Sequence, residues 1–223
     1  MKTSVFHDWL YDDAVAFMET TRQKIIDGDV KSETIAVGIH LENVITLGRH
    51  APRTQILNDA VVAKRNILVR AVTRGGGATA HGPGQIVVYP VISLRRHALS
   101  IPQLVAHLEG AAIAVLSELG EVGTRICGQP GVFVGGAKIA SVGIHVRRGV
   151  VNHGLAFNVG NDLSVFSLIA PCGVVGQPIT SLERLGKSRP IDDVVKALVH
   201  AVKKRLVGDN SDEQPCETLA ATR

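Results

Sequence analysis

A glycine-rich stretch directly before an apolar run limits what this chain can fold into. Residues 74–85 read RGGGATAHGPGQ, with five glycines around Arg74 and His81, and IVVYPVI follows at once. A backbone this free of side chains lets another group approach closely. The Walker loop needs a Gly-Lys-Ser/Thr ending, and the dinucleotide-binding loop opens a helix, not a strand. Both common phosphate-binding loops are excluded, which leaves a plain turn at a strand end or a wall against which a ligand can lie.

Hydrophobic periodicity predicts an α/β protein of the α+β type, with a mixed β-sheet and flanking helices. Apolar residues recur at helical spacing in three segments, at about 12–27, 101–119 and 191–206. Strand-type runs bounded by Gly, Pro and Asn lie at about 34–40, 44–48, 67–72, 85–92, 131–134, 138–146 and 150–159. The last two runs flank Arg147-Arg148-Gly149, which predicts an antiparallel hairpin.

Length and composition favour one soluble domain in a reducing compartment. The 223 residues are 45% hydrophobic and 20% charged, and no run approaches membrane-spanning length. Residues 1–207 are expected to form a single domain, and the polar residues 208–223 a disordered tail. Three cysteines without a C-x-x-C pair, and acidic residues near the N-terminus where a signal peptide would be apolar, favour the cytoplasm.

The net charge of +4 is too mild to require a particular partner. It permits an acidic protein partner. Aromatic residues make up only 4% of the chain, and no basic stripe is interleaved with them, so the usual signature of single-strand nucleic-acid binding is missing.

Cys172 is a candidate nucleophile. It lies in Pro171-Cys172-Gly173, within the apolar segment SLIAPCGVVG. A cysteine among apolar neighbours is either an inert buried thiol or a reactive group that something nearby must activate.

Lys138 is the residue that could activate such a thiol. In KIASVGIHV, strand alternation predicts that Lys138 shares one face with Ala140, Val142, Ile144 and Val146. A lysine on an apolar face either reaches solvent at the end of the strand or lies in a partly desolvated site with an anionic partner.

The histidines carry weaker signals. His81 is interpreted as part of a cavity wall, with a proton carrier and a turn-stabilising histidine as alternatives. His145 and His153 flank the predicted hairpin turn, but the nine histidines lack metal-ligand spacing, so no metal site is expected. Arg147 and Arg148 are either solvated charges or a docking point for an acidic carrier protein.

Three ordered blocks give the sequence its resemblance to a known family. The blocks are RGGGATAHGPGQIVVYP, KIASVGIHVRRGVVNHGLAFNV and PCG. In this order they resemble the lipoyl(octanoyl) transferases, also called lipoate-protein ligase B, over about residues 47–182. The resemblance implies the lipoate/biotin protein ligase-like fold.

The resemblance also implies roles for individual residues. Cys172 matches the acyl-thioester nucleophile and Lys138 the lysine that acts on it. Three segments match those that line the acyl-binding site: Arg74, Gly75, Gly76, Gly77, Ala78, Thr79, Ala80 and His81; Ser141, Val142 and Gly143; and Gly154, Leu155 and Ala156.

The chain departs from the family pattern at two places. Gly77 and Ala80 stand where the family usually has a larger polar residue and a tyrosine, and GIHLENVI replaces the usual His-Pro-Pro-containing segment before residues 46–49. These departures bear on the width and polarity of the acyl site, and hence on acyl chain length.

The implied activity is transfer of an octanoyl or lipoyl group from acyl carrier protein to a lysine of lipoyl domains. The acceptors would be the lipoyl domains of 2-oxoacid dehydrogenases and the glycine cleavage H protein. No ATP and no metal cofactor are expected. Two alternatives remain: an ATP-dependent lipoate ligase on the same scaffold, and a non-catalytic module that binds an acyl group or a lipoyl domain.

Overall fold

A seven-stranded mixed sheet forms the centre of the molecule. The computed structural model describes residues 1–171 and 173–208. Along the sheet the strands are β1 (Lys2–Trp9), β2 (Thr34–His40), β6 (Gln85–Val91), β10 (Val150–Asn158), β9 (Ala137–Arg147), β8 (Gln129–Val134) and β7 (Thr124–Ile126). Only the β1–β2 pair is parallel. The mixed sheet with flanking helices confirms the predicted fold class.

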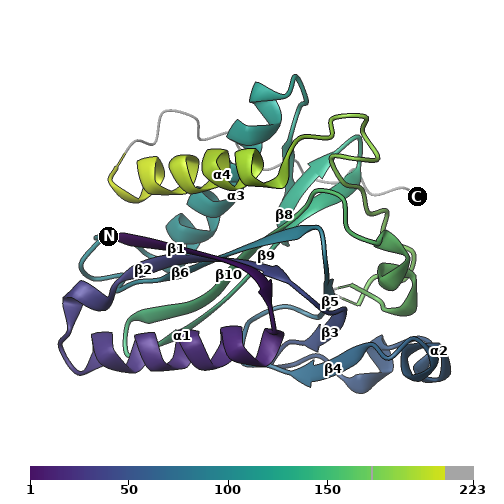
Figure 1. Ribbon diagram of the computed structural model, residues 1–223, viewed down its shortest axis with the longest axis horizontal. Coiled ribbons are helices and arrows are strands. Elements are labelled where there is room, and N and C mark those ends of the chain that lie inside the picture. Colours follow the sequence, from purple (N-terminus) through teal and green to yellow (C-terminus); the bar gives the residue numbers. More distant parts are fainter. Residues whose placement is uncertain (172, 209–223) are drawn as a thin grey trace.

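A smaller three-stranded sheet lies at one end of the large sheet (Figure 1). Its order is β4 (Leu68–Ala71), β3 (Val44–Leu47) and β5 (Ala78–His81), accompanied by the short helix α2 (Asp59–Lys64). Ile45, Val62 and Phe166 belong to its own hydrophobic core. Phe166 lies in a 3-10 helix, Leu163–Leu168, which ties the later part of the chain to this small sheet.

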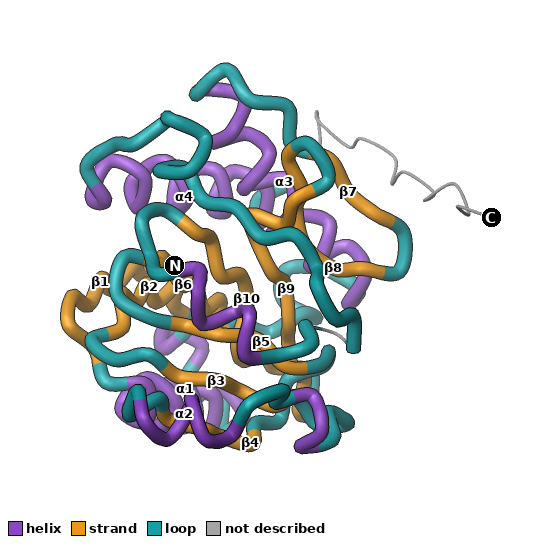
Figure 2. Tube along the Cα trace, turned by 90° about the vertical axis from the view of Figure 1, so that its right-hand side faces the viewer, coloured by secondary structure: helices purple, strands orange, loops and turns teal. Residues whose placement is uncertain are grey.

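Helices cover both faces of the large sheet (Figures 1 and 2). α3 (Ile101–Glu118) and α4 (Ile191–Leu206) pack together over one face and bury the largest core cluster there. α1 (Tyr11–Ile26) packs against β6 and β10 on the other face. α3 begins at a capping box, in which Ser100 and Gln103 satisfy each other's backbone N–H groups. Because α1 starts beside the small sheet, both sheets and α1 meet at one place.

Every helix and strand predicted from periodicity is present, with ends that differ by at most two residues. Four elements were not predicted, namely β1, α2, β5 and β7. β5 is the instructive case, since Ala78–His81 falls inside the glycine-rich stretch and consists of small and polar residues. It is a strand because it pairs antiparallel with β3 from Leu47 to Val44. The stretch is therefore a loop plus a strand, not only a turn.

The predicted hairpin between β9 and β10 is confirmed. Val150 pairs with Arg147, so Arg148 and Gly149 form a two-residue connection. Both connecting residues have positive φ, 48° and 75°. Two consecutive positive φ angles match the right-handed twist of the paired strands, which makes this a favoured hairpin turn.

A bulge in β9 corrects the prediction that Lys138 shares a strand face with Ala140. Val132 of β8 pairs with Ala140, but the next residue, Phe133, pairs with Lys138, so Ile139 is an extra residue. Ile139 and Ala140 both belong to the core under α3 and α4. Lys138 instead contributes to a cavity wall with Ser141. The extra residue breaks the alternation on which the prediction relied.

The cysteines differ from expectation at one described position. Cys127, in the turn between β7 and β8, is disulfide-bonded. Three cysteines without a C-x-x-C pair predict reduced thiols, but sequence spacing does not show which cysteine side chains meet in space. Cys172 and Cys216 lie outside the described residues, as does the predicted tail beyond Gly208. In the described part of the chain, no helix is both long and apolar enough to cross a membrane.

Candidate active site

A cavity opens where the two sheets and the start of α1 meet. The empty space at this place measures about 580 Å³, a volume that includes space open to solvent. Its wall consists of Tyr11, Arg74, Gly75, Gly76, Gly77, Ala78, Thr79, His81, Val87, Tyr89, Pro130, Lys138, Ser141, Val142, Gly143, His153, Gly154, Ala156 and Pro171. Segments far apart in the sequence thus form one site.

Arg74 holds the glycine-rich loop in shape. Its guanidinium is buried and donates to the carbonyls of Gly75, Gly77 and Thr46 at 2.8–3.0 Å, and to the Thr46 hydroxyl at 2.7 Å. Carbonyls from the loop and from β3 therefore converge on one cation. Gly75 N–H also donates to Ile144 O at 2.9 Å, which fastens the loop to β9. These hydrogen bonds fix the conformation of the glycine-rich loop, and most of them come from Arg74.

Two glycines of the wall allow backbones to meet closely. A Cβ on Gly154 would lie 2.1 Å from Val88 O, and a Cβ on Gly143 would lie 3.1 Å from Arg74 Cδ. The distance from a Gly154 Cβ to Val88 O is much shorter than a van der Waals contact, and Val88 O is a backbone atom held within the sheet. Gly154 is therefore required for β10 to pair with β6, and the absence of its side chain also leaves space in the cavity.

His81 lines the cavity and is uncharged at neutral pH. Burial, the largest cause, and the nearby His40 and Arg74 together lower its pKa to about 3. Its Nδ1 lies 2.8 Å from Gln85 Oε1, and its ring stacks on Tyr11 with centroids 5.8 Å apart. A histidine with so low a pKa is better suited to lining the cavity than to carrying a proton.

Tyr11 and Tyr89 also line the cavity. Burial raises the pKa of Tyr11 to about 12 and that of Tyr89 well above its usual value. Tyr89 OH lies 2.7 Å from His40 Nε2, and burial lowers the pKa of His40. All these rings are neutral, so Tyr11, Tyr89 and His81 give the cavity apolar ring faces, while Tyr89 and His81 also have polar partners within the protein.

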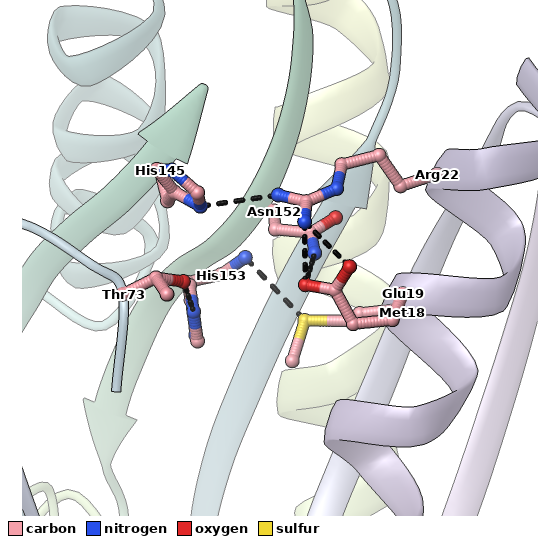
Figure 3. Close-up of polar contacts among 7 residues, drawn as sticks. All are labelled: Met18, Glu19, Arg22, Thr73, His145, Asn152 and His153. Atoms are coloured by element: carbon pink, nitrogen blue, oxygen red, sulfur yellow. Dashed lines mark hydrogen bonds and ion pairs between the residues drawn. The ribbon is translucent and has the colours of Figure 1, made fainter. Parts of the chain in front are cut away.

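His153 is a wall residue with an unusual backbone. Its φ is 60°, which non-glycine residues rarely adopt, and it is buried. Its N–H points to Met18 Sδ of α1 at 3.4 Å, and its Nε2 lies 3.4 Å from Thr73 Oγ1 (Figure 3). Burial, and then the charge of Arg74, lower its pKa to about 3.

A polar cluster beside His153 ties α1 to the hairpin (Figure 3). Arg22 of α1 forms an ion pair with Glu19 and lies 3.1 Å from His145 Nδ1 on β9. Asn152 of β10 donates to the same Glu19 carboxylate at 3.1 Å. Burial and the charge of Arg22 lower the pKa of His145, so the imidazole can accept from the guanidinium. This cluster fixes the strand that carries His153.

Lys138 is buried at the cavity wall, with 5% of its surface exposed. Of the two alternatives from sequence, the structure thus supports a desolvated site. Its ammonium lies 5.3 Å from the centre of the Phe133 ring, a cation–π contact. Its backbone accepts from Thr180 N–H and donates to Pro178 O, at 2.9 and 2.8 Å. The segment that contains Pro178 and Thr180 therefore fixes the backbone of Lys138.

Cys172 itself lies outside the described residues, but Pro171, the residue before it, lines the cavity. Pro171 lines the cavity and forms a parallel bridge with Ala78 of β5. Gly173 N–H donates to Ala170 O at 2.9 Å.

The cavity brings together most of the residues singled out from the sequence. The exceptions among the described residues are Ala80, whose side chain belongs to the core of the small sheet, and Leu155, which belongs to the core under α3 and α4. Alternation explains Leu155, because its neighbours Gly154 and Ala156 face the other way. The catalytic and binding roles stay predictions.

Tyr11, Val87, Tyr89 and Pro130 were not predicted to line a site. Alternation along the strand over residues 85–91 puts Val87 and Tyr89 on one face, so a pattern existed for that pair. Nothing in the sequence indicates that the start of α1 lies beside them.

Within the described ranges, no group of three or more His, Cys, Asp or Glu side chains is arranged to hold a metal ion. The expectation that no cofactor is needed stays a prediction.

The fold is that of lipoate and biotin protein ligases. The chain is similar to a bipartite lipoate protein ligase from Thermoplasma acidophilum, with a TM-score of 0.69 and 16% identity over 99% of this chain and 87% of that one. A biotin protein ligase from Aquifex aeolicus gives a TM-score of 0.51 at 12% identity, over 92% and 69% of the two chains. At such identities the likeness establishes the fold alone.

Sequence relatives narrow the assignment. An octanoyltransferase of Thiobacillus denitrificans is 41% identical over 73% of this chain and 72% of its own length. An octanoyltransferase of Magnetococcus marinus is 38% identical over 89% and 90%. The model of the lipoyl protein ligase A/B catalytic domain matches residues 11–203. The chain belongs to this family, as its three sequence blocks predict.

Proposed function

We propose that this protein is an octanoyltransferase that moves an octanoyl group from acyl carrier protein to a lysine of lipoyl domains, through a thioester on Cys172. The activity rests on relatives named octanoyltransferase that share about 40% of their residues with this chain over most of its length. The observation that carries the mechanism is the buried Lys138 at the wall of a cavity that Pro171, the residue before Cys172, also lines.

The proposed chemistry depends on making the Cys172 sulfur anionic. A cysteine with the ordinary pKa of about 8.5 is only about 3% thiolate at neutral pH, and the thiolate is the attacking species. Lowering that pKa to about 7 takes about 2 kcal/mol. An ammonium about 4 Å away supplies about 4 kcal/mol at an effective dielectric constant of about 20. One lysine is therefore sufficient, even after part of this gain is lost to desolvation.

In the first step the thiolate attacks the octanoyl carbonyl on the carrier's phosphopantetheine sulfur. A new C–S bond to Cys172 forms and the C–S bond to the carrier breaks, while Lys138 gives a proton to the leaving thiolate. In the second step the acceptor lysine's amine attacks the acyl-enzyme. An amide forms, Cys172 leaves as thiolate, and the amine's proton returns to Lys138.

The cavity suits the acyl group and the tetrahedral intermediate. Glycine backbone and the neutral rings of Tyr11, Tyr89 and His81 give a straight hydrocarbon chain a largely apolar wall. Backbone N–H groups near the wall are the candidate donors to the oxyanion.

The first step exchanges one thioester for another and the second forms an amide from a thioester. The free energy of the donor thioester therefore drives the cycle, and no nucleotide is required. The rival is an ATP-dependent lipoate ligase, since a structurally similar protein is a lipoate-protein ligase A bound with ATP.

A transfer assay separates the two functions. Octanoyl-acyl carrier protein and an apo lipoyl domain are mixed with the enzyme without nucleotide, and the mass of the acceptor is followed. Octanoylation of the acceptor supports the transferase. A requirement for ATP, or transfer from free octanoate but not from the carrier, would support the ligase instead.

The proposed partners are octanoyl-acyl carrier protein and the lipoyl domains of 2-oxoacid dehydrogenases and of the glycine cleavage H protein. The proposed location is the cytoplasm.

A further inference from the structure

Glu109 carries a buried carboxylate near the cavity wall, and packing alone does not explain why a charged side chain is found there. Glu109 lies in the middle of α3, only 7% exposed, with core residues Leu108 and Ala112 nearby on the same helix. A carboxylate in such a place is costly unless it is paired and hydrogen-bonded. Burial raises its pKa, and the Gly131 N–H, Arg125 and Lys138 all act to lower it.

Two of these partners fix the carboxylate at the end of the sheet. Glu109 Oε1 accepts from Gly131 N–H of β8 at 2.8 Å, and Oε2 lies 3.2 Å from Arg125 Nε of β7. Both side chains of the ion pair are 9% exposed. The pair therefore interacts in a medium where charges are weakly screened.

Gly131 connects this carboxylate to Lys138. A Cβ on Gly131 would lie 2.5 Å from Lys138 Cε and 2.3 Å from Ala140 O, and its φ of 139° disfavours any side chain. The stem of Lys138 thus passes directly over the Gly131 backbone, while the N–H of that residue binds Glu109. The Glu109 carboxylate and the Lys138 ammonium also attract each other electrostatically.

The other charged or titratable groups around Glu109 come from three elements. Arg125 lies on β7 and His107 is buried on α3 itself. Arg205 of α4 lies beside Gly110, where a Cβ would be 2.6 Å from its Nε and 3.2 Å from Arg125 Nη2. Of these groups, Arg125 pairs directly with Glu109, and Lys138 is the other cation whose charge acts on it.

We propose that Glu109 is a positioning residue that keeps the Lys138 side chain protonated and held over Gly131 at the cavity wall. The proposal rests on the proposed role of Lys138 in acyl transfer. Without the carboxylate the ammonium loses a buried counter-charge and Gly131 loses the hydrogen bond that fixes its orientation. Lys138 then gives up its proton at lower pH, and the thiolate–ammonium pair is lost sooner as the pH rises.

The test compares Glu109→Gln with a matched control, Glu33→Gln. Glutamine can still accept from Gly131 N–H but carries no charge. Glu33 is also a buried carboxylate, with Arg96 and His97 within 3.3 Å, but it lies elsewhere in the fold. The ionisation of Lys138 is followed by NMR of protein labelled with carbon-13 at lysine Cε, and the signal is assigned by its loss in Lys138→Met.

We expect Glu109→Gln to move the Lys138 titration to lower pH by about 1 unit and to move the alkaline limb of kcat/KM in the same direction. Glu33→Gln should move neither. A folded Glu109→Gln protein in which Lys138 titrates as in the unaltered chain, or whose alkaline limb stays in place, overturns the proposal.

A reciprocal measurement covers the case in which Glu109→Gln does not fold, since it leaves Arg125 unpaired. Removing the ammonium in Lys138→Met should raise the pKa of Glu109, followed by carbon-13 at the glutamate carboxyl. An unchanged Glu109 titration contradicts the proposal. These titrations need no substrate, so their outcome is independent of the proposed function, which the transfer assay without nucleotide tests separately.

Discussion

Lys138 shows what one residue gains from its surroundings. Lys138 is buried beside the Phe133 ring, and its charge acts on the buried Glu109 carboxylate. In the proposed mechanism it supplies positive charge to Cys172 and also exchanges a proton.

Lys138→Arg keeps the positive charge but cannot release a proton at accessible pH. We expect it to lose about 100-fold or more in octanoyl transfer, the scale of general acid–base catalysis, with the fold intact. Steady-state kinetics measure the effect. Full activity in the arginine variant would reduce Lys138 to an electrostatic partner.

Gly154 tests the close approach of β10 to β6. In Gly154→Ala the new Cβ meets Val88 O at 2.1 Å, so a strand must shift. We expect a loss of about 2–3 kcal/mol in the free energy of unfolding, measured by urea titration. Gly160→Ala is the control, because its Cβ has nothing nearer than 3.5 Å; equal losses in both variants would refute the explanation.

At the scale of the element, the bulge in β9 decides which way Lys138 points. The sequence predicts the strand because Val and Ile alternate along it, but one extra residue, Ile139, reverses the alternation at Lys138. No residue type marks this position. Similarly, β5 forms only because β3 lies beside it, and short polar strands carry little local signal.

The polar cluster between α1 and the β9–β10 hairpin is a second case of one element fixing another. In Arg22→Gln, the buried guanidinium that joins Glu19 and His145 is lost. We expect a loss of about 1–2 kcal/mol in stability, less than for a fully buried pair because Glu19 is half-exposed.

Arg53→Gln is the matched control for Arg22, since its ion pair with Asp59 is exposed on both sides. It should change the free energy of unfolding by at most about 0.5 kcal/mol. Similar losses in the two variants would show that the cluster contributes no more than a surface ion pair.

For the whole molecule, periodicity and the three sequence blocks predict the fold class, the family and most of the cavity wall. They do not predict that Tyr11 and Tyr89 join Lys138 at one cavity, because these contacts depend on how α1 and the small sheet pack together. Nor do they reveal Glu109, which reads as an ordinary polar position in an amphipathic helix.

The neutral histidines make the stability of the whole fold depend on pH. His81 and His153 have a pKa of about 3 when folded and an ordinary value near 6.5 when unfolded. The unfolded chain therefore binds more protons between these values, so their contribution is present above about pH 6.5 and is lost as the pH falls toward 3.

We expect each of these two histidines to contribute up to about 1.4 kcal/mol per pH unit in that window. Urea unfolding at pH 7, 6 and 5 measures the slope. His81→Asn should flatten it, whereas the exposed His200→Asn should not. An unchanged slope in His81→Asn would contradict the assignment of a neutral, buried His81.

The central claim is a covalent octanoyl group on Cys172, and intact mass under turnover with octanoyl-acyl carrier protein tests it most directly. With reductant present, the unaltered enzyme and Cys127→Ser should each gain one octanoyl group, and Cys172→Ala should gain none. An adduct that persists in Cys172→Ala would contradict the account, as would continued transfer to the lipoyl domain by that variant.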